Sequence, residues 1–99
     1  METETNEIKD ITPSIAREIT QEAMDWESIV QKEINERVPE NAKCGERECR
    51  IVIGLPKGMK QFSATTLDII RAAFIRKDWS IKNFGVEPGL GAVLVDIEW

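Results

Sequence analysis

The sequence lacks the residue types that most enzymes use as bases and metal ligands. Its 99 residues include no histidine, no tyrosine and only two cysteines. Without histidine, a serine or cysteine nucleophile has no base of the usual kind to take its proton. The two cysteines, Cys44 and Cys49, cannot complete a four-ligand zinc site within one chain. We therefore expect no enzyme activity, no catalytic residues, no metal site and no cofactor.

Long apolar runs and a basic leader are also missing. No run approaches the ~18 apolar residues that a membrane span needs. The first seven residues are polar and acidic, whereas a secretory signal begins with positive charge. We expect a cytoplasmic location, in a cell or a virus-infected host, or a place in a virion, with no membrane partner. Disulfides are rare in reducing compartments, so Cys44 and Cys49 are predicted to be free thiols, with Cys49 facing the core.

The net charge of −5 is unevenly distributed along the chain. Residues 1–49 contain 13 acidic and 6 basic side chains, whereas residues 50–82 contain 7 basic and 2 acidic ones. Such a split is typical of a polyanion-binding half, of two halves that attract each other, or of a solvated surface. Because the whole chain is negative and would repel nucleic acid, polyanion binding is the second hypothesis. Its candidate residues are Lys57, Lys60, Arg71, Arg76, Lys77 and Lys82.

A single long amphipathic helix is predicted over residues 13–38. Thr12 and Pro13 supply an N-cap hydroxyl and a proline at the first helical position, and Pro39 ends the run. At ~1.5 Å per residue this helix would span ~39 Å, more than a domain of this size is expected to bury. The helix therefore either bends or overhangs the body and packs against another chain. Its apolar stripe, assigned to the core rather than to a coiled-coil interface, consists of Ile15, Ile19, Ala23, Trp26, Val30, Ile34 and Val38.

Residues 50–79 read as a strand, a loop and a second helix. The loop contains glycine and lysine but fails the spacing of a phosphate-binding loop, so we interpret it as a connection. The helix, over residues 65–78, has one apolar side for the core and a second apolar side formed by Ala72, Ile75 and Trp79. Either the first helix or another molecule covers that second side. The core side consists of Leu67, Ile70, Ala73 and Phe74.

The order of these elements predicts an α+β fold. Two strands, residues 80–86 and 91–99, follow the second helix and are joined by a Pro88-Gly89 turn. We predict a two-layer sandwich of order α-β-α-β-β, with a three-stranded mixed sheet and two helices on one face. A polar acidic arm, residues 1–12, precedes a single domain of residues 13–99. A half-apolar open sheet face and the second side of the later helix supply the candidate interface: Val52, Phe84, Val86, Leu94, Ile75 and Trp79.

Four segments together carry a resemblance to other small proteins. They are the amphipathic N-terminal helix, the strand at residues 50–53, the helix end and strand at residues 77–82, and the last strand at residues 94–99. In this layout the chain resembles small α-β-α-β-β proteins that are frequent in bacteriophage genomes. The resemblance implies a virion or assembly component, or a small binder of a host protein, and it carries over no functional residues.

Three functional hypotheses remain open at this point. The first is a non-enzymatic protein–protein interaction or assembly module, which either self-associates or binds a protein partner. The alternative is a nucleic-acid-binding protein that uses the basic segment 50–82. A third is an acidic decoy for a basic host protein, which would use the carboxylates of the first helix.

Overall fold

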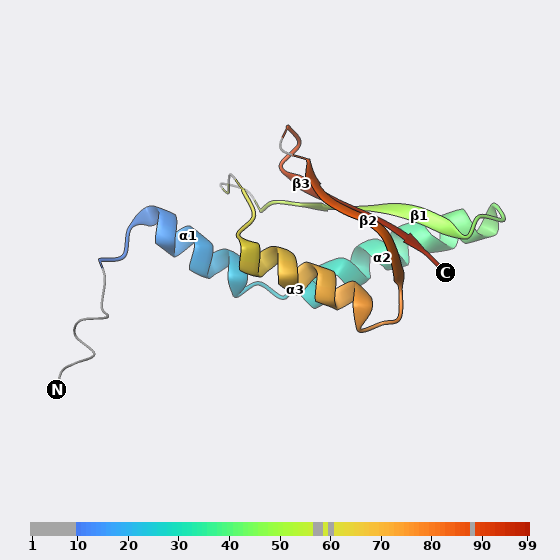
Figure 1. Cartoon of the computed structure of the whole chain (residues 1–99), viewed down its shortest axis with the longest axis horizontal. Helices are drawn as coiled ribbons and strands as arrows, with labels where there is room; N and C mark the ends of the chain where they lie inside the picture. Colours follow the sequence, from blue (N-terminus) through green and yellow to red (C-terminus); the bar gives the residue numbers. More distant parts are fainter. Residues whose placement is uncertain (1–9, 57–58, 60, 88) are drawn as a thin grey trace.

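The computed structural model of the chain describes residues 10–56, 59, 61–87 and 89–99. Within these ranges it contains three helices and three strands (Figure 1). In chain order they are α1 (Pro13–Glu22), α2 (Trp26–Lys43), β1 (Glu48–Gly54), α3 (Ala64–Ile75), β2 (Ser80–Glu87) and β3 (Ala92–Glu98). The α+β class is confirmed, but the order is α-α-β-α-β-β. Outside the described residues lie most of the predicted arm, two candidate cations (Lys57 and Lys60) and Pro88 of the predicted turn.

The prediction of a single long helix is wrong, because a second helix, α2, begins at Trp26 with Asp25 as its N-cap. The Asp25 carboxylate accepts hydrogen bonds from the backbone N–H and the hydroxyl of Ser28, at 3.2 and 2.8 Å. An aspartate at the N-cap satisfies a free N–H of the first turn. The bonds from Ser28 also hold the pKa of Asp25 below its ordinary value. The cap lets α1 and α2 follow separate directions: α2 runs along the sheet, whereas α1 leaves the body (Figure 1).

The predicted end of the helix before Pro39 is also wrong, since α2 continues to Lys43. Pro39 is exposed, so the carbonyl that loses its hydrogen bond to the proline lies on the solvent side of the helix. Cys44 is the C-cap, and the next residue, Gly45, has a φ of +87°. There the backbone N–H groups of Gly45 and Glu46 donate to carbonyls of the last helical turn. This is a Schellman end, which favours glycine because the left-handed backbone strains a side chain.

The three strands form one antiparallel sheet in the order β1-β3-β2, so the predicted mixed sheet is wrong. β1 and β2, the two strands on either side of α3, do run parallel to each other, but β3 lies between them. The hairpin of β2 and β3, which are consecutive and joined by a short connection, is confirmed. β1 pairs with the other edge of β3, the edge that β2 leaves free, and not with β2.

A β-bulge in β2 reverses the faces predicted for that strand. The register with β3 shifts by one residue between Ile81 and Asn83, which leaves Lys82 as an extra residue. One extra residue turns every later side chain to the opposite face. Phe84 and Val86 therefore lie on the face that the helices cover, and not on the open face as predicted.

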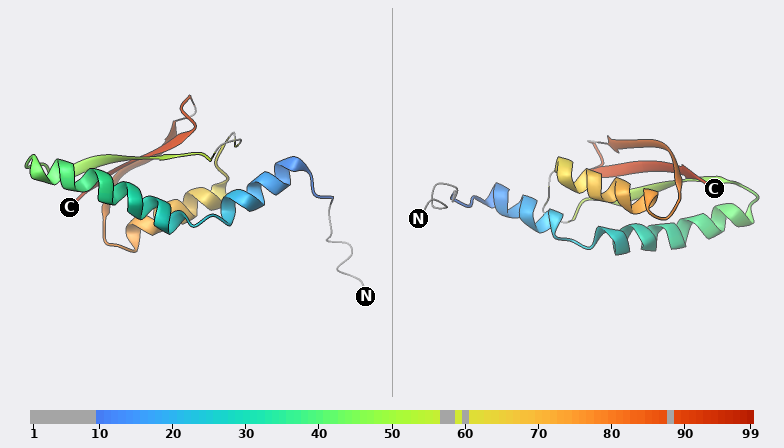
Figure 2. Two further views of the ribbon diagram at one scale, coloured as in Figure 1. Left: turned by 180° about the vertical axis from the view of Figure 1, so that it is seen from behind. Right: turned by 60° about the horizontal axis from the view of Figure 1, so that its bottom comes forward.

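α2 and α3 cover one face of the sheet, which gives two layers (Figure 2). The predicted inward direction of Cys49 is confirmed. The only buried residue of α1 is Gln21, so the core role predicted for the α1 part of the apolar stripe is wrong. None of the helices in the described ranges is long and apolar enough to cross a membrane. The main core residues are Trp26, Val30 and Ile34 of α2, Ile70, Ala73 and Phe74 of α3, and Ile51, Ile53, Val93, Val95 and Ile97 of the sheet.

Candidate functional site

Helix α1 presents an apolar face to solvent. Ile11 and Ile19 expose 64% and 56% of their surface, and Ile15 between them is half-buried. Ile15 and Ile19, four residues apart, lie on one side of the helix, and Ile11 lies in the segment just before the N-cap Thr12. We call Ile11, Ile15 and Ile19 the isoleucine face. Both views in Figure 2 show α1 extending past the end of the sheet, so this face lies at the periphery of the molecule.

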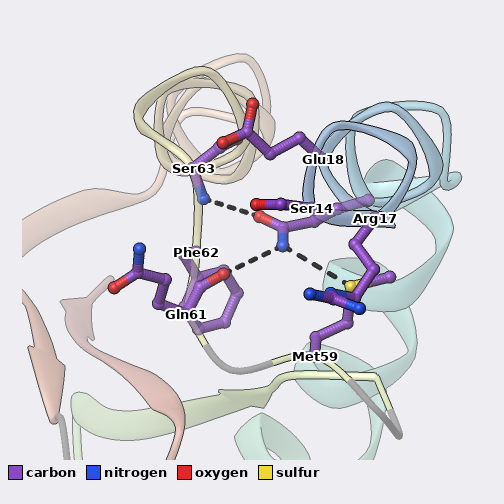
Figure 3. A pocket seen from close by; sticks show the side chains of 8 residues that line it. Ser14, Arg17, Glu18, Met59, Gln61, Phe62 and Ser63 are labelled. Atoms are coloured by element: carbon purple, nitrogen blue, oxygen red, sulfur yellow. Dashed lines mark hydrogen bonds between the residues drawn. The ribbon is translucent and has the colours of Figure 1, made fainter. Parts of the chain in front are cut away.

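α1 is attached to the body by its polar side, through Gln21. The Gln21 side chain is 2% exposed. Its oxygen accepts a hydrogen bond from the backbone N–H of Ser63 at 2.7 Å, and its nitrogen donates to the carbonyl of Gln61 at 3.0 Å (Figure 3). The backbone carbonyl of Gln21 accepts from the indole N–H of Trp26 at 2.7 Å, and the Ser63 hydroxyl donates to Glu22 at 3.0 Å. These bonds fix α1 to the segment before α3 and to the start of α2.

This attachment turns the isoleucine face away from the body. At ~100° per residue, Gln21 lies ~120° around the helix from Ile15. An open cleft of about 320 Å³ separates α1 from the segment that precedes α3 (Figure 3). An amphipathic helix of a monomer normally turns its apolar side inward, so the orientation of α1 is reversed. The cleft is lined by Ser14, Arg17, Glu18, Gln21, Met59, Gln61, Phe62 and Ser63.

A second apolar surface lies where α3 runs beside the edge strand β2. The Arg71 guanidinium of α3 lies 5.3 Å from the centre of the Phe84 ring of β2. One turn further along α3, Ile75 is 56% exposed, and two residues further along β2, Val86 is 43% exposed. We call Ile75, Arg71, Phe84 and Val86 the α3–β2 flank. It contains three of the six residues of the predicted interface, on a different surface from the open sheet face.

The open face of the sheet has fewer apolar residues than predicted, because Phe84 and Val86 lie on the other face. Its half-buried apolar residues Val52 and Leu94 lie directly opposite each other. Beside them Arg50 donates to both carboxylate oxygens of Asp96, at 2.7 and 3.1 Å. The bonds from Arg50 hold the pKa of Asp96 below its usual range, and the carboxylate in turn raises the pKa of Arg50. Two apolar side chains beside an ion pair make a weaker docking surface than a half-apolar face would.

Trp79, the last of the predicted interface residues, is part of an aromatic pair. Its ring packs edge-on against that of Trp99, with the ring centroids 6.0 Å apart. Both residues are half-buried and contact the core. Edge-to-face pairs stabilise a fold beyond the area that they bury. This pair therefore closes one end of the core, at the C-terminal end of α3.

The described cations of the predicted polyanion site are spread over several surfaces. Arg71 lies on the α3–β2 flank, Arg76 forms an ion pair with α2, and Lys82 forms one with β1. Lys77 donates to a side chain of α2 at 3.4 Å. A nucleic-acid strand is bound by a continuous positive surface. Each of these four side chains instead contacts an acidic, polar or aromatic side chain of its own chain.

Both cysteines are free, as predicted. Cys44 is exposed near the end of α2, and Cys49 is buried in β1. Burial raises the pKa of the Cys49 thiol. Among the residues that the structure describes, no group of three or more cysteine, aspartate or glutamate side chains is placed to hold a metal ion.

Sequence reasoning missed the role of Gln21. The residue falls on the polar side of the predicted helix, where a glutamine is unremarkable, and its burial arises from backbone groups about 40 positions later in the chain. Ile15 and Ile19 did stand out by their periodicity, but the pattern was assigned to the core. No protein-family model, no curated protein and no solved structure matches the chain, so its function is inferred from the surfaces described above.

Proposed function

We propose that this protein is a non-enzymatic protein–protein interaction module whose binding surface is the isoleucine face of α1. The main support is the orientation of α1: Gln21 holds its polar side to the body while Ile11 and Ile19 remain 64% and 56% exposed. Burying an isoleucine side chain fully is worth ~1.5–3 kcal/mol, so a covering partner would recover a large part of that for each. A role as a virion or assembly component, or as a binder of a host protein, would use such a surface.

The charge of α1 favours a protein partner over a lipid surface. Helices that lie on membranes carry lysine and arginine on their polar face. Residues 10–22 contain Arg17 and three carboxylates, those of Asp10, Glu18 and Glu22. An anionic membrane would repel this segment, whereas a protein groove with a basic rim would attract it.

A matched pair of variants tests the proposal. Ile19→Asp places a carboxylate in the isoleucine face, and Thr20→Asp places the same carboxylate one residue later, on an exposed side of the helix away from that face. Wild type and both variants are immobilised and exposed to a lysate of the organism of origin. We expect proteins that bind wild type and T20D but not I19D, because a charge in an apolar contact is left without hydration.

Two results would overturn the proposal. Equal capture by all three chains would show that the isoleucine face takes no part in binding. Co-sedimentation of wild type, but not of I19D, with vesicles of phosphatidylcholine and phosphatidylglycerol would replace the protein partner by a lipid surface. Circular dichroism of the three chains is the control for folding.

A further inference from the structure

We infer that the partner of the isoleucine face is a second copy of the same chain, in a two-fold dimer where each α1 docks along the α3–β2 flank of the other subunit. This inference rests on the proposed function and specifies its partner. The large apolar side chains that are exposed in the described ranges are Ile11, Ile19, Ile75, Val86 and Leu90. Four of these five lie on the two surfaces that the dimer would join. A chain that carries both halves of a contact can form an isologous dimer, in which each contact occurs twice.

The two surfaces are of similar length. From Pro13 to Ile19 the helix rises ~9 Å, at ~1.5 Å per residue, and Ile11 lies two residues before Pro13. On the flank, Ile75 lies one turn, ~6 Å, beyond Arg71, which covers Phe84. Val86 lies ~7 Å from Phe84 in the other direction along β2. The flank therefore offers an apolar line of ~13 Å, the sum of these two steps, with its cation near the middle.

The arrangement of α1 and α3 determines how the two chains would meet. Figures 1 and 2 show α1 and α3 running in roughly the same direction, with α1 lying beyond the N-terminal end of α3. A two-fold axis at that end, perpendicular to both helices, places α1 beside the partner's α3 with the opposite direction. Ile11 then meets the Ile75 end of the flank, and Ile19 meets the Val86 end. The same operation brings the partner's α1 onto the first chain, so both isoleucine faces are covered.

Charge agrees with this exchange. Residues 10–22 carry three carboxylates and one arginine, and Arg71 stands near the middle of the flank, so segments of opposite net charge meet. A ten-residue helix is ~15 Å long and ~10 Å wide, so a single helix-to-helix contact covers only ~150 Å² in projection on each side. The exchange has two such contacts and covers ~600 Å² in total, whereas pairing of the two α1 helices alone would cover ~300 Å². Stable interfaces bury ~1,200–2,000 Å², so the exchange comes nearer to that area. The small area predicts a weak dimer.

Sedimentation equilibrium of the full chain, from ~1 to ~300 µM, tests the dimer with a complementation design. Ile19→Asp damages the isoleucine face, Val86→Asp damages the flank, and Thr20→Asp is the control. We expect wild type and T20D to dimerise, and I19D and V86D each to dimerise at least ~10-fold more weakly.

In a mixture of I19D and V86D, one chain supplies an intact α1 and the other an intact flank. One of the two contacts is then undamaged, and the mixed dimer should form more tightly than either variant with itself. Ile75→Asp serves as a second flank variant if V86D does not fold.

The outcomes separate this inference from the proposed function. A wild-type chain that stays monomeric to ~300 µM overturns the second copy as partner, while capture of another protein by the isoleucine face would still stand. A dimer that I19D weakens but V86D and I75D leave intact overturns docking on the flank, because it indicates pairing of the two α1 helices. A dimer unaffected by I19D overturns the inference, and the capture experiment then decides the proposed function separately.

Discussion

Replacing Gln21 with leucine tests whether one buried amide holds α1 in its outward orientation. Leucine keeps most of the bulk of the side chain, but it cannot accept a hydrogen bond from Ser63 or donate one to Gln61. The variant therefore loses two bonds, of 2.7 and 3.0 Å, and leaves a backbone N–H and a backbone carbonyl without their partner.

The size of the loss follows from the surroundings of those two groups. A hydrogen bond contributes ~0.5–1.5 kcal/mol net, and a buried group left unpaired costs ~1–3 kcal/mol. Ser63 is half-buried and Gln61 is exposed, so water can replace part of what Gln21 supplied. We expect the free energy of unfolding to fall by ~1–3 kcal/mol, which lowers the Tm of a domain of this size by at least ~4 °C.

Urea unfolding followed by tryptophan fluorescence measures this loss, because Trp26 donates to the Gln21 backbone and packs against Phe62. The matched control is Gln61→Leu, the same substitution at an exposed side chain whose backbone carbonyl remains in place. The control should stay within ~0.5 kcal/mol of wild type. A Q21L protein as stable as wild type would refute the view that Gln21 anchors α1.

Gln21→Glu adds a pH dependence to the same test. A carboxylate at this position can still accept from Ser63, but its other oxygen would face the Gln61 carbonyl without a proton between them. Burial and this repulsion should raise the folded-state pKa of the new glutamate above ~4.3. The stability of Q21E is then fully present below pH ~4.3, the unfolded-state pKa of glutamate, and part of it is lost as the pH rises through the raised folded-state pKa. We expect Q21E to approach wild type at low pH and to be less stable at neutral pH; a constant difference between the two would contradict the geometry.

Three further predictions concern the rest of the fold. Arg50 lowers the pKa of Asp96 in the folded protein. The stability that Asp96 contributes is therefore present above pH ~3.9, its unfolded-state pKa, and is lost as the pH falls through the lowered folded-state pKa. Thermal melts of D96N and wild type should differ at neutral pH and converge in strong acid. Gly45→Ala should cost ~1 kcal/mol in urea unfolding, through its φ of +87° alone, since no atom lies within 4 Å of the added methyl group; an unchanged midpoint would mean that the α2 end adapts. A thiol reagent should modify one cysteine, Cys44, in the native protein and both in denaturant, because Cys49 is buried and its thiol pKa is raised; rapid native labelling of two thiols would contradict this.

Much of the local structure could be predicted from residue patterns. The alternation along β1 and β3 identified their buried faces, and the helical period identified the core face of α3 and of α2. The boundary between α1 and α2 was missed although Asp25 is a good N-cap, because the apolar period continues across it and outweighed the cap. The bulge also had a signal: Lys82 and Asn83 are consecutive polar residues that break the alternation between Ile81 and Phe84.

The candidate site was less predictable, because its properties depend on distant parts of the chain. Three residues of the predicted interface, Ile75, Phe84 and Val86, share a surface, but only through the register of β2 and the contact between Arg71 and Phe84. The isoleucine stripe was visible by its spacing. Whether such a stripe faces a core or solvent is a matter of rotation about the helix axis, which spacing does not contain.

The sequence by itself determined the α+β class, the helix cap at Thr12 and the inward direction of Cys49, because caps and side-chain alternation act over a few residues. The tertiary structure decided the central place of β3 and the outward orientation of α1. Both depend on hydrogen bonds between groups far apart in the chain: the ladders that join β3 to β1 and β2, and the bonds from Gln21 to the segment before α3. A pattern of residues shows which sides of an element are apolar, whereas only such long-range bonds decide which of them the fold covers.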